Sequence, residues 1–147
     1  MPRENILVSA CLCGIKCRYD GSAFYCKGIE KLLKKYTVIP FCPELLAGQS
    51  IPRPPVEIVK GKAQTCSGEE QTRQFKLGAK ISLTLAKRFD VKKAFLKSGS
   101  PSCGCETIYD GTFSGKLIKG RGFTAGLFAK NGVKTFSERH MLGERGI

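Results

Sequence analysis

Short apolar runs of strand character recur along the chain, and segments of helical character separate them. The predicted strands are residues 5–10, 37–41, 93–97 and 133–136. Helical segments such as residues 29–35 lie between them, and this alternation favours right-handed crossovers and a parallel sheet. The sequence therefore predicts the α/β class: a small doubly wound (Rossmann-like) parallel sheet with helices on both faces, in a single domain over residues 1–147.

The longest predicted helix lies in the middle of the chain. Ser67 and Glu70 have the spacing of a capping box, which is typical of a helix start. Beyond them, mostly small and apolar residues recur at helical spacing, and we expect this narrow face to pack on the sheet. The face consists of Phe75, Gly78, Ala79, Ser82, Leu85, Ala86 and Phe89. Shorter helices are predicted directly after Cys42 and, capped by Thr124, at residues 125–130.

Two further segments lie outside these elements. The run Pro-Arg-Pro-Pro at residues 52–55 excludes regular structure, because each proline fixes its own φ and disfavours helix in the residue before it. We interpret this run as a stiff surface connector; the alternative is that it holds Arg53 toward an anionic or polar ligand. Residues 113–120 are expected to form a small hairpin or an ordered loop.

Three cysteines follow the ends of predicted strands: Cys11, Cys42 and Cys103. Because ligands of parallel α/β sheets gather at the carboxyl ends of the strands, we expect these thiols to converge on one edge of the sheet. Three thiolates suit an iron–sulfur cubane with one open iron. A structural zinc usually takes four ligands in closely spaced pairs, and the sequence offers only partial pairs. Spacing alone supports iron–sulfur and zinc equally, with inert buried thiols as a third interpretation.

Two polar features lie beside these cysteines. Glu44 is the best candidate for an acid–base group, because a partly shielded carboxylate beside a metal centre can have its pKa moved into a useful range. Its alternative role is to favour the start of a short helix. The turn at residues 98–104, rich in serine and glycine, can hold an anion or a polar heterocycle, or it is an ordinary turn between strand and helix.

Composition narrows the class of protein. The chain has 147 residues and eight cysteines, and no apolar stretch approaches the roughly 18 residues of a membrane span. The short apolar run near the start does not form a secretory signal, so we expect a cytoplasmic protein whose cysteines serve as ligands or catalytic thiols. The 25 Lys and Arg against 12 Asp and Glu give a net charge of +13, which attracts anionic substrates and leaves nucleic-acid binding open.

Six motifs follow one another along most of the chain. They are Val8-Ser9-Ala10-Cys11-Leu12, Cys17-Arg18-Tyr19-Asp20-Gly21, Cys42-Pro43-Glu44, Pro52-Arg53-Pro54-Pro55, Lys97-Ser98-Gly99-Ser100-Pro101-Ser102-Cys103-Gly104 and Tyr109-Asp110-Gly111-Thr112-Phe113-Ser114-Gly115. In this order they resemble a bacterial family, long of unknown function, that includes the 2-thiouracil desulfurases. The resemblance implies a 4Fe–4S cluster held by three cysteines, which correspond to Cys11, Cys42 and Cys103.

The resemblance also implies that Glu44 is the acidic catalytic residue and that Ser100 is an active-site serine. Cys17 corresponds to a position that varies between cysteine and valine, so it is not assigned as a ligand. Cys13 and Cys105 fall where ordinary residues are expected, and either thiol is a candidate for the fourth iron.

The implied activity is a non-redox, 4Fe–4S-dependent desulfuration. The thiocarbonyl sulfur of a thiolated pyrimidine such as 2-thiouracil would be replaced by oxygen, with the sulfur leaving through the open iron, which prefers soft donors. The expected partner is therefore a small thiolated heterocycle, and thiolated tRNA bases belong to the same chemical class. Two alternatives stay open: a metal-stabilised RNA-binding module, and a sulfur carrier with a reactive Cys103 or Cys105.

Overall fold

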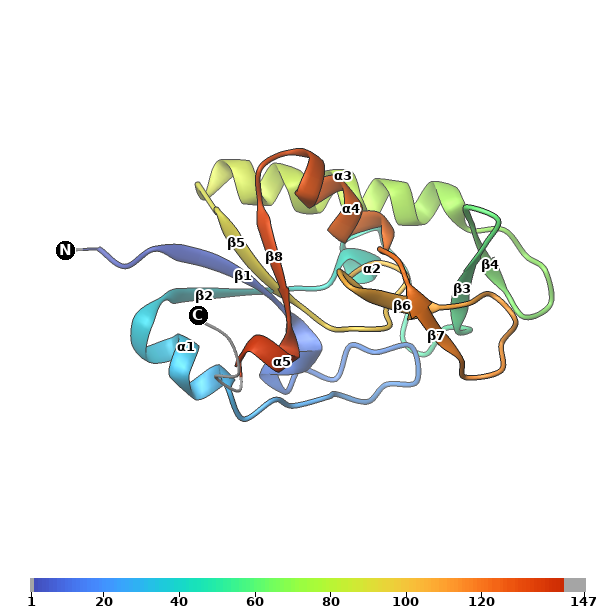
Figure 1. Ribbon diagram of the computed structural model, residues 1–147, viewed down its shortest axis with the longest axis horizontal. Helices are drawn as coiled ribbons and strands as arrows, with labels where there is room; N and C mark the ends of the chain where they lie inside the picture. The colour runs from blue at the N-terminus through green and yellow to red at the C-terminus, as the bar shows by residue number, and fades with distance from the viewer. Residues whose placement is uncertain (1, 142–147) are drawn as a thin grey trace.

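Four parallel strands form the centre of the protein in the computed structural model, which describes residues 2–141 (Figure 1). They are β1 (Asn5–Ser9), β2 (Thr37–Phe41), β5 (Lys93–Leu96) and β8 (Lys134–Ser137). Their order in the sheet is β2-β1-β5-β8, and all neighbours are parallel. From β1 the chain first adds β2 on one side, and it later adds β5 and then β8 on the other side of β1. The predicted α/β fold with a doubly wound parallel sheet is confirmed.

Helices cover both faces of this sheet because the side chains of its buried strands alternate between two cores. Ile6 and Val8 of β1 pack with α1 (Ile29–Lys35) and α5 (Glu138–Met141) on one face. Leu7 points the other way, into the core that α3 (Thr72–Arg88) and α4 (Phe123–Lys130) cover. Figure 1 shows these two helix pairs on opposite sides of the strands.

The long helix α3 starts later than its capping box predicted. The residues before it form a hairpin of β3 (Val56–Val59) and β4 (Lys62–Thr65), which the sequence analysis did not predict. Ser67 lies within hydrogen-bonding distance of Thr65, 3.0 Å between their hydroxyl oxygens, and caps no helix. The capping-box prediction is wrong because pairing with β3 extends the chain through Thr65, and the helix begins only after Gln71.

The predicted packing face of this helix is largely correct. Its first and middle members are buried, namely Phe75, Gly78, Ala79, Ser82 and Ala86. Phe89 at the end of the helix is 45% exposed, so its assignment to the packing face was wrong. Thr124 is buried inside α4, whose N-cap is Gly122, so the prediction that Thr124 caps this helix was also wrong.

Irregular segments gather beyond the carboxyl ends of β1, β2 and β5. A 3₁₀ turn, Ala10–Cys13, follows β1, and the short helix α2 (Pro43–Leu46) follows β2, as predicted. A second hairpin pairs β6 (Thr107–Tyr109) with β7 (Leu117–Lys119). Of the hairpin or ordered loop expected at residues 113–120, the structure shows a hairpin, which begins earlier, at Thr107. Since the winding reverses between β1 and β5, this edge is the topological switch point where such folds bind ligands. Residues 2–141 include no helix long and apolar enough to cross a membrane.

Candidate active site

A cavity of about 350 Å³ opens at the switch point. Its wall includes residues from the ends of three strands and from both hairpins. The residues that line it include Cys11, Cys17, Cys42, Glu44, Arg53, Glu57, Lys97, Ser98, Ser100, Cys103, Tyr109 and Phe113. The five site residues predicted from the sequence, three cysteines with Glu44 and Ser100, are all among them. The structure therefore brings the predicted residues together in one place.

The three predicted ligand cysteines reach the cavity from different elements. Cys11 lies in the 3₁₀ turn after β1, Cys42 at the start of α2 after β2, and Cys103 in the loop after β5. Cys11 and Cys103 are buried, and Cys42 is half-buried. Parallel strands carry these thiols to the same edge, which is the physical reason that the pattern in the sequence predicted their meeting.

A fourth thiol, Cys17, lies in the same cavity, which sequence reasoning did not anticipate. Hydrogen bonding with Cys11 and burial raise the pKa of Cys17 to about 11, although hydrogen bonding with Cys42 lowers it in part. Cys17 therefore stands between two of the predicted ligands. Its position in the second sequence motif was the only signal that could have pointed to it.

The loop that carries Cys103 is held by hydrogen bonds on both sides. Oγ of Ser100 accepts the backbone N–H groups of Ser102 at 3.1 Å and of Cys103 at 2.9 Å. The first amides of α4 donate to carbonyl oxygens of the same loop, as in the 2.9 Å bond from Phe123 to Pro101, so the loop satisfies a helix terminus that would otherwise lack partners. Ser100 thus fixes the loop that carries Cys103 in addition to lining the cavity.

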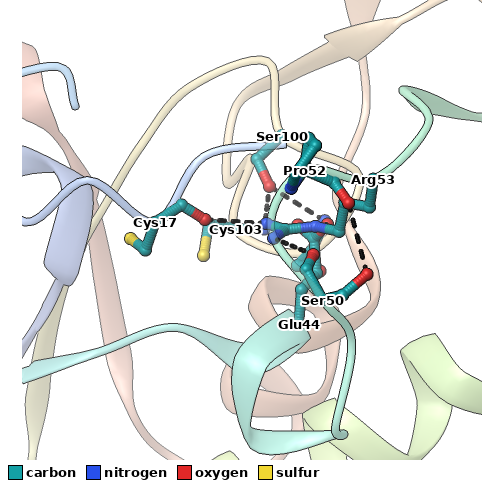
Figure 2. A network of polar contacts seen from close by, with 8 residues as sticks. Cys17, Glu44, Ser50, Pro52, Arg53, Ser100 and Cys103 are labelled. Carbon is teal, nitrogen blue, oxygen red and sulfur yellow. Dashed lines mark hydrogen bonds and ion pairs between the residues drawn. The ribbon is translucent and has the colours of Figure 1, made fainter. Parts of the chain in front are cut away.

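Arg53 occupies the centre of a buried polar network beside the thiols (Figure 2). Its Nε donates to Oε1 of Glu44 at 2.9 Å, and its two terminal nitrogens donate to the backbone carbonyls of Ser50 at 3.1 Å and Cys17 at 2.9 Å. The side chain of Arg53 is only 5% exposed. Interpreting residues 52–55 as a simple surface connector was therefore wrong: the flanking prolines are largely exposed, while Arg53 turns inward and joins Glu44 to the Cys17 segment.

The donor set of the cavity fits a soft-metal cluster. Burial raises the pKa of Cys103, and hydrogen bonding with Cys17 together with burial raises the pKa of Cys42, so a cation beside these thiols would favour their deprotonation. Iron–sulfur clusters are held by such thiolates. Within residues 2–141 no three His, Cys, Asp or Glu side chains are grouped closely enough for a single metal ion. The three predicted ligands instead line the wall of the wider cavity.

Comparison with known proteins identifies the family. The sequence model of the 2-thiouracil desulfurase family matches residues 6–140. The chain belongs to this family. The resemblance inferred from six motifs is confirmed, and the match extends through the end of β8.

Two relatives match nearly the whole chain. The uncharacterized protein YbbK of Bacillus subtilis (strain 168) is 44% identical over 146 residues, which covers 92% of this chain and 97% of that protein. The solved structure of the 4Fe-4S-dependent thiouracil desulfidase TudS superimposes with a TM-score of 0.89 at 38% identity, covering 96% of this chain and 95% of that one. Both the family and the fold therefore rest on full-length similarity.

Proposed function

We propose that this protein replaces the thiocarbonyl sulfur of 2-thiouracil by oxygen, using a 4Fe–4S cluster held by Cys11, Cys42 and Cys103. Membership of the 2-thiouracil desulfurase family and the likeness to the 4Fe-4S-dependent TudS make the protein a cluster-dependent desulfurase. The observation that carries the assignment of residues is that the three thiols, Glu44 and Ser100 line one cavity at the switch point of the sheet.

The chemistry divides between the cluster and the protein. When bound, the cluster supplies an iron without a protein ligand, a Lewis acid that prefers a sulfur donor to an oxygen donor. The protein lines the cavity with side chains that can bind and orient the heterocycle, among them Glu44 and Ser100. A substrate in this cavity would therefore react with positioned protein groups close to its C=S carbon.

Glu44 is the proposed acid–base residue. Arg53 donates to Oε1, and within residues 2–141 this is the hydrogen-bonded oxygen of Glu44, so Oε2 is the oxygen that takes a proton from the attacking water and passes it to the departing sulfide. Such proton transfer contributes typically about 10²- to 10⁴-fold to a rate. Ser100 would orient the heterocycle with its O–H, because its oxygen already accepts the two loop amides.

The sulfur-carrier alternative fits the site less well. Cys103 and Cys105 are 5% and 7% exposed, whereas a carrier thiol must meet its partner at the surface. Burial also raises the pKa of Cys105 to about 11, so little thiolate forms at neutral pH. The desulfurase proposal places the protein in the cytoplasm, because the ligand cysteines must stay reduced.

Anaerobic reconstitution with iron and sulfide, followed by measurement of sulfide and uracil formed from 2-thiouracil, tests the proposal. The loaded protein should release one sulfide for each uracil, and the iron-free protein none. Glu44→Gln should retain iron but lose at least about 100-fold in kcat. Glu106→Gln, at an exposed position outside the cavity lining, is the matched control and should behave as wild type. Turnover by iron-free protein, or full activity of Glu44→Gln, would contradict the proposal.

A further inference from the structure

The loop between β6 and β7 contributes a wall of the cavity to which the desulfuration proposal gives no role. Phe113 and Tyr109 line the same cavity as the thiols, but they come from the hairpin rather than from the strand ends. The hairpin lies beside β3 and β4 (Figure 1), and β3 contacts β6 directly. The cavity therefore has one wall of ligand loops and another wall that carries aromatic side chains.

The backbone of this loop is held in an unusual conformation. Phe113 has φ +58°, a left-handed value that is uncommon for a bulky side chain. Residue 111 also has a positive φ, +91°, and a Cβ there would lie 2.8 Å from the carbonyl oxygen of Ile58, so only glycine fits. An outlier at a cavity wall is a reason to look for a function of the residue that adopts it.

One carboxylate from the neighbouring hairpin maintains this conformation. Oε1 of Glu57 in β3 accepts the backbone N–H of Gly111 at 3.0 Å and the backbone N–H of Phe113 at 3.1 Å. Asp110 closes the turn from within, because its Oδ1 accepts the backbone N–H of Thr112 at 2.9 Å. The loop is thus fixed from two directions at Phe113, one of the residues that line the cavity.

We propose that Phe113 is a substrate-binding residue, whose ring stacks on the face of the thiolated pyrimidine, and that Glu57 is the positioning residue that holds it there. This inference rests on the proposed function for its substrate class. A planar heterocycle presents a π-face to an aromatic ring, and such stacking is worth about 1–3 kcal/mol per base by alanine substitution. Because a ring–ring contact of this kind acts on bound substrate and transition state alike, it should appear in KM and leave kcat largely unchanged.

Phe113→Gly tests the ring without demanding a strained backbone, since glycine adopts the left-handed conformation freely. With 2-thiouracil and the loaded enzyme, we expect KM to rise roughly 5- to 160-fold, with kcat within about threefold of wild type. Phe113→Tyr keeps an aromatic ring at this position and should leave KM close to the wild-type value. Phe89→Leu, at the exposed end of α3, is the control aromatic substitution and should change neither constant.

Glu57 is tested by a pair of variants. Glu57→Ala removes the acceptor of both amides and should raise KM in the same direction as Phe113→Gly. Glu57→Gln keeps an oxygen that can accept both, so it should recover most of the wild-type KM. Equal effects of Ala and Gln, or a fall in kcat without a change in KM, would overturn the positioning role.

A binding measurement separates this inference from the desulfurase proposal. Uracil, which contains no sulfur, should bind the loaded wild-type protein in a ligand-observed NMR titration, and Phe113→Gly should weaken that binding by the same factor as KM. If the wild type binds uracil but releases no sulfide from 2-thiouracil, the proposed function is wrong, while the stacking role of Phe113 is still supported by the loss of uracil binding in Phe113→Gly. If Phe113→Gly binds uracil as tightly as wild type, the stacking role of Phe113 is refuted, whether or not the protein releases sulfide from 2-thiouracil. Absence of uracil binding to the wild type also refutes it.

Discussion

Arg53 donates from Nε to Oε1 of Glu44 at 2.9 Å, and the two side chains are only 5% and 16% exposed. The same guanidinium donates to the backbone carbonyl of Cys17, so one side chain connects the proposed acid–base group to the loop beside the thiols. A buried pair of this kind contributes little net stability compared with apolar packing, but it is costly to break. Its value here is that it fixes where the Glu44 carboxylate lies.

Removing Arg53 should therefore affect both stability and turnover. Arg53→Met leaves Glu44 without its partner in a largely buried position, and we expect a loss of about 3–5 kcal/mol in the free energy of unfolding. Arg53→Lys keeps the charge but cannot reproduce three donors in a planar fork, so it should fall between wild type and Arg53→Met. Urea unfolding of the loaded protein, with kcat measured beside it, checks this. Arg88→Met on exposed helix surface is the control, and an equal midpoint for Arg53→Met and wild type would contradict the expectation.

Cluster retention should separate the cavity thiols into ligands and neighbours. Serine variants of Cys11, Cys42 and Cys103 should each lose most of the iron and acid-labile sulfide, because thiolates are the ligands of such clusters. Cys17→Ser should keep the iron, because the resemblance to the family assigns the three ligand positions to Cys11, Cys42 and Cys103 and none to Cys17. The exposed Cys66 provides the control, Cys66→Ser. Iron and sulfide per chain after anaerobic reconstitution are the measurement, and a loss for Cys17→Ser as deep as for Cys103→Ser would make Cys17 a fourth ligand.

The sequence was most informative where a short pattern of residues also determines how distant segments are arranged in the fold. Apolar runs predicted the strands, and the polarity of a parallel sheet then placed Cys11, Cys42 and Cys103 at one edge. The hairpin of β3 and β4 was missed, although Lys60 and Gly61 join its strands as a two-residue turn with φ values of +50° and +79°. Such turns are normally recognised by Asn-Gly or Asp-Gly, and a lysine in the first position hides the signal.

The interior positions of Arg53 and Cys17 could not be read from the sequence. A charged residue between prolines is normally exposed, and only contacts with distant segments make its burial tolerable. These contacts are the carboxylate of Glu44, nine residues away, and the carbonyl of Cys17, thirty-six residues away. Burial of this kind depends on tertiary structure, so local patterns carry little information about it.

The carboxyl-terminal segment should contribute to the site through Glu138. Its carboxylate accepts the backbone N–H of Ser98 at 2.8 Å and the Ser98 hydroxyl at 2.6 Å, at the start of the loop that carries Cys103. Glu138→Ala should lower the free energy of unfolding by about 1–3 kcal/mol, because it leaves partly buried donors without an acceptor. It should also speed the loss of iron to a chelator, and Glu138→Gln should lose less. Bleaching of the cluster absorbance by a chelator is the measurement. An unchanged bleaching rate for Glu138→Ala would show that the hydrogen bonds from Ser98 to Glu138 do not hold the loop that carries Cys103.

Close packing of α3 on α2 should control the position of Cys42 and Glu44. A Cβ on Gly78 would collide with the carbonyl oxygen of Pro43, the residue between them. Gly78→Ala would gain up to about 1 kcal/mol from helix propensity alone. Because the obstacle is backbone, we expect the steric term to prevail, with a lower unfolding midpoint and reduced iron content. Gly126→Ala is the matched control: it lies within α4, where an added Cβ meets nothing within 4 Å, so the same substitution should stabilise the protein or leave it unchanged. If both glycine variants unfold above the wild-type midpoint and retain full iron, α2 moves freely on α3 and the close contact does not position the site.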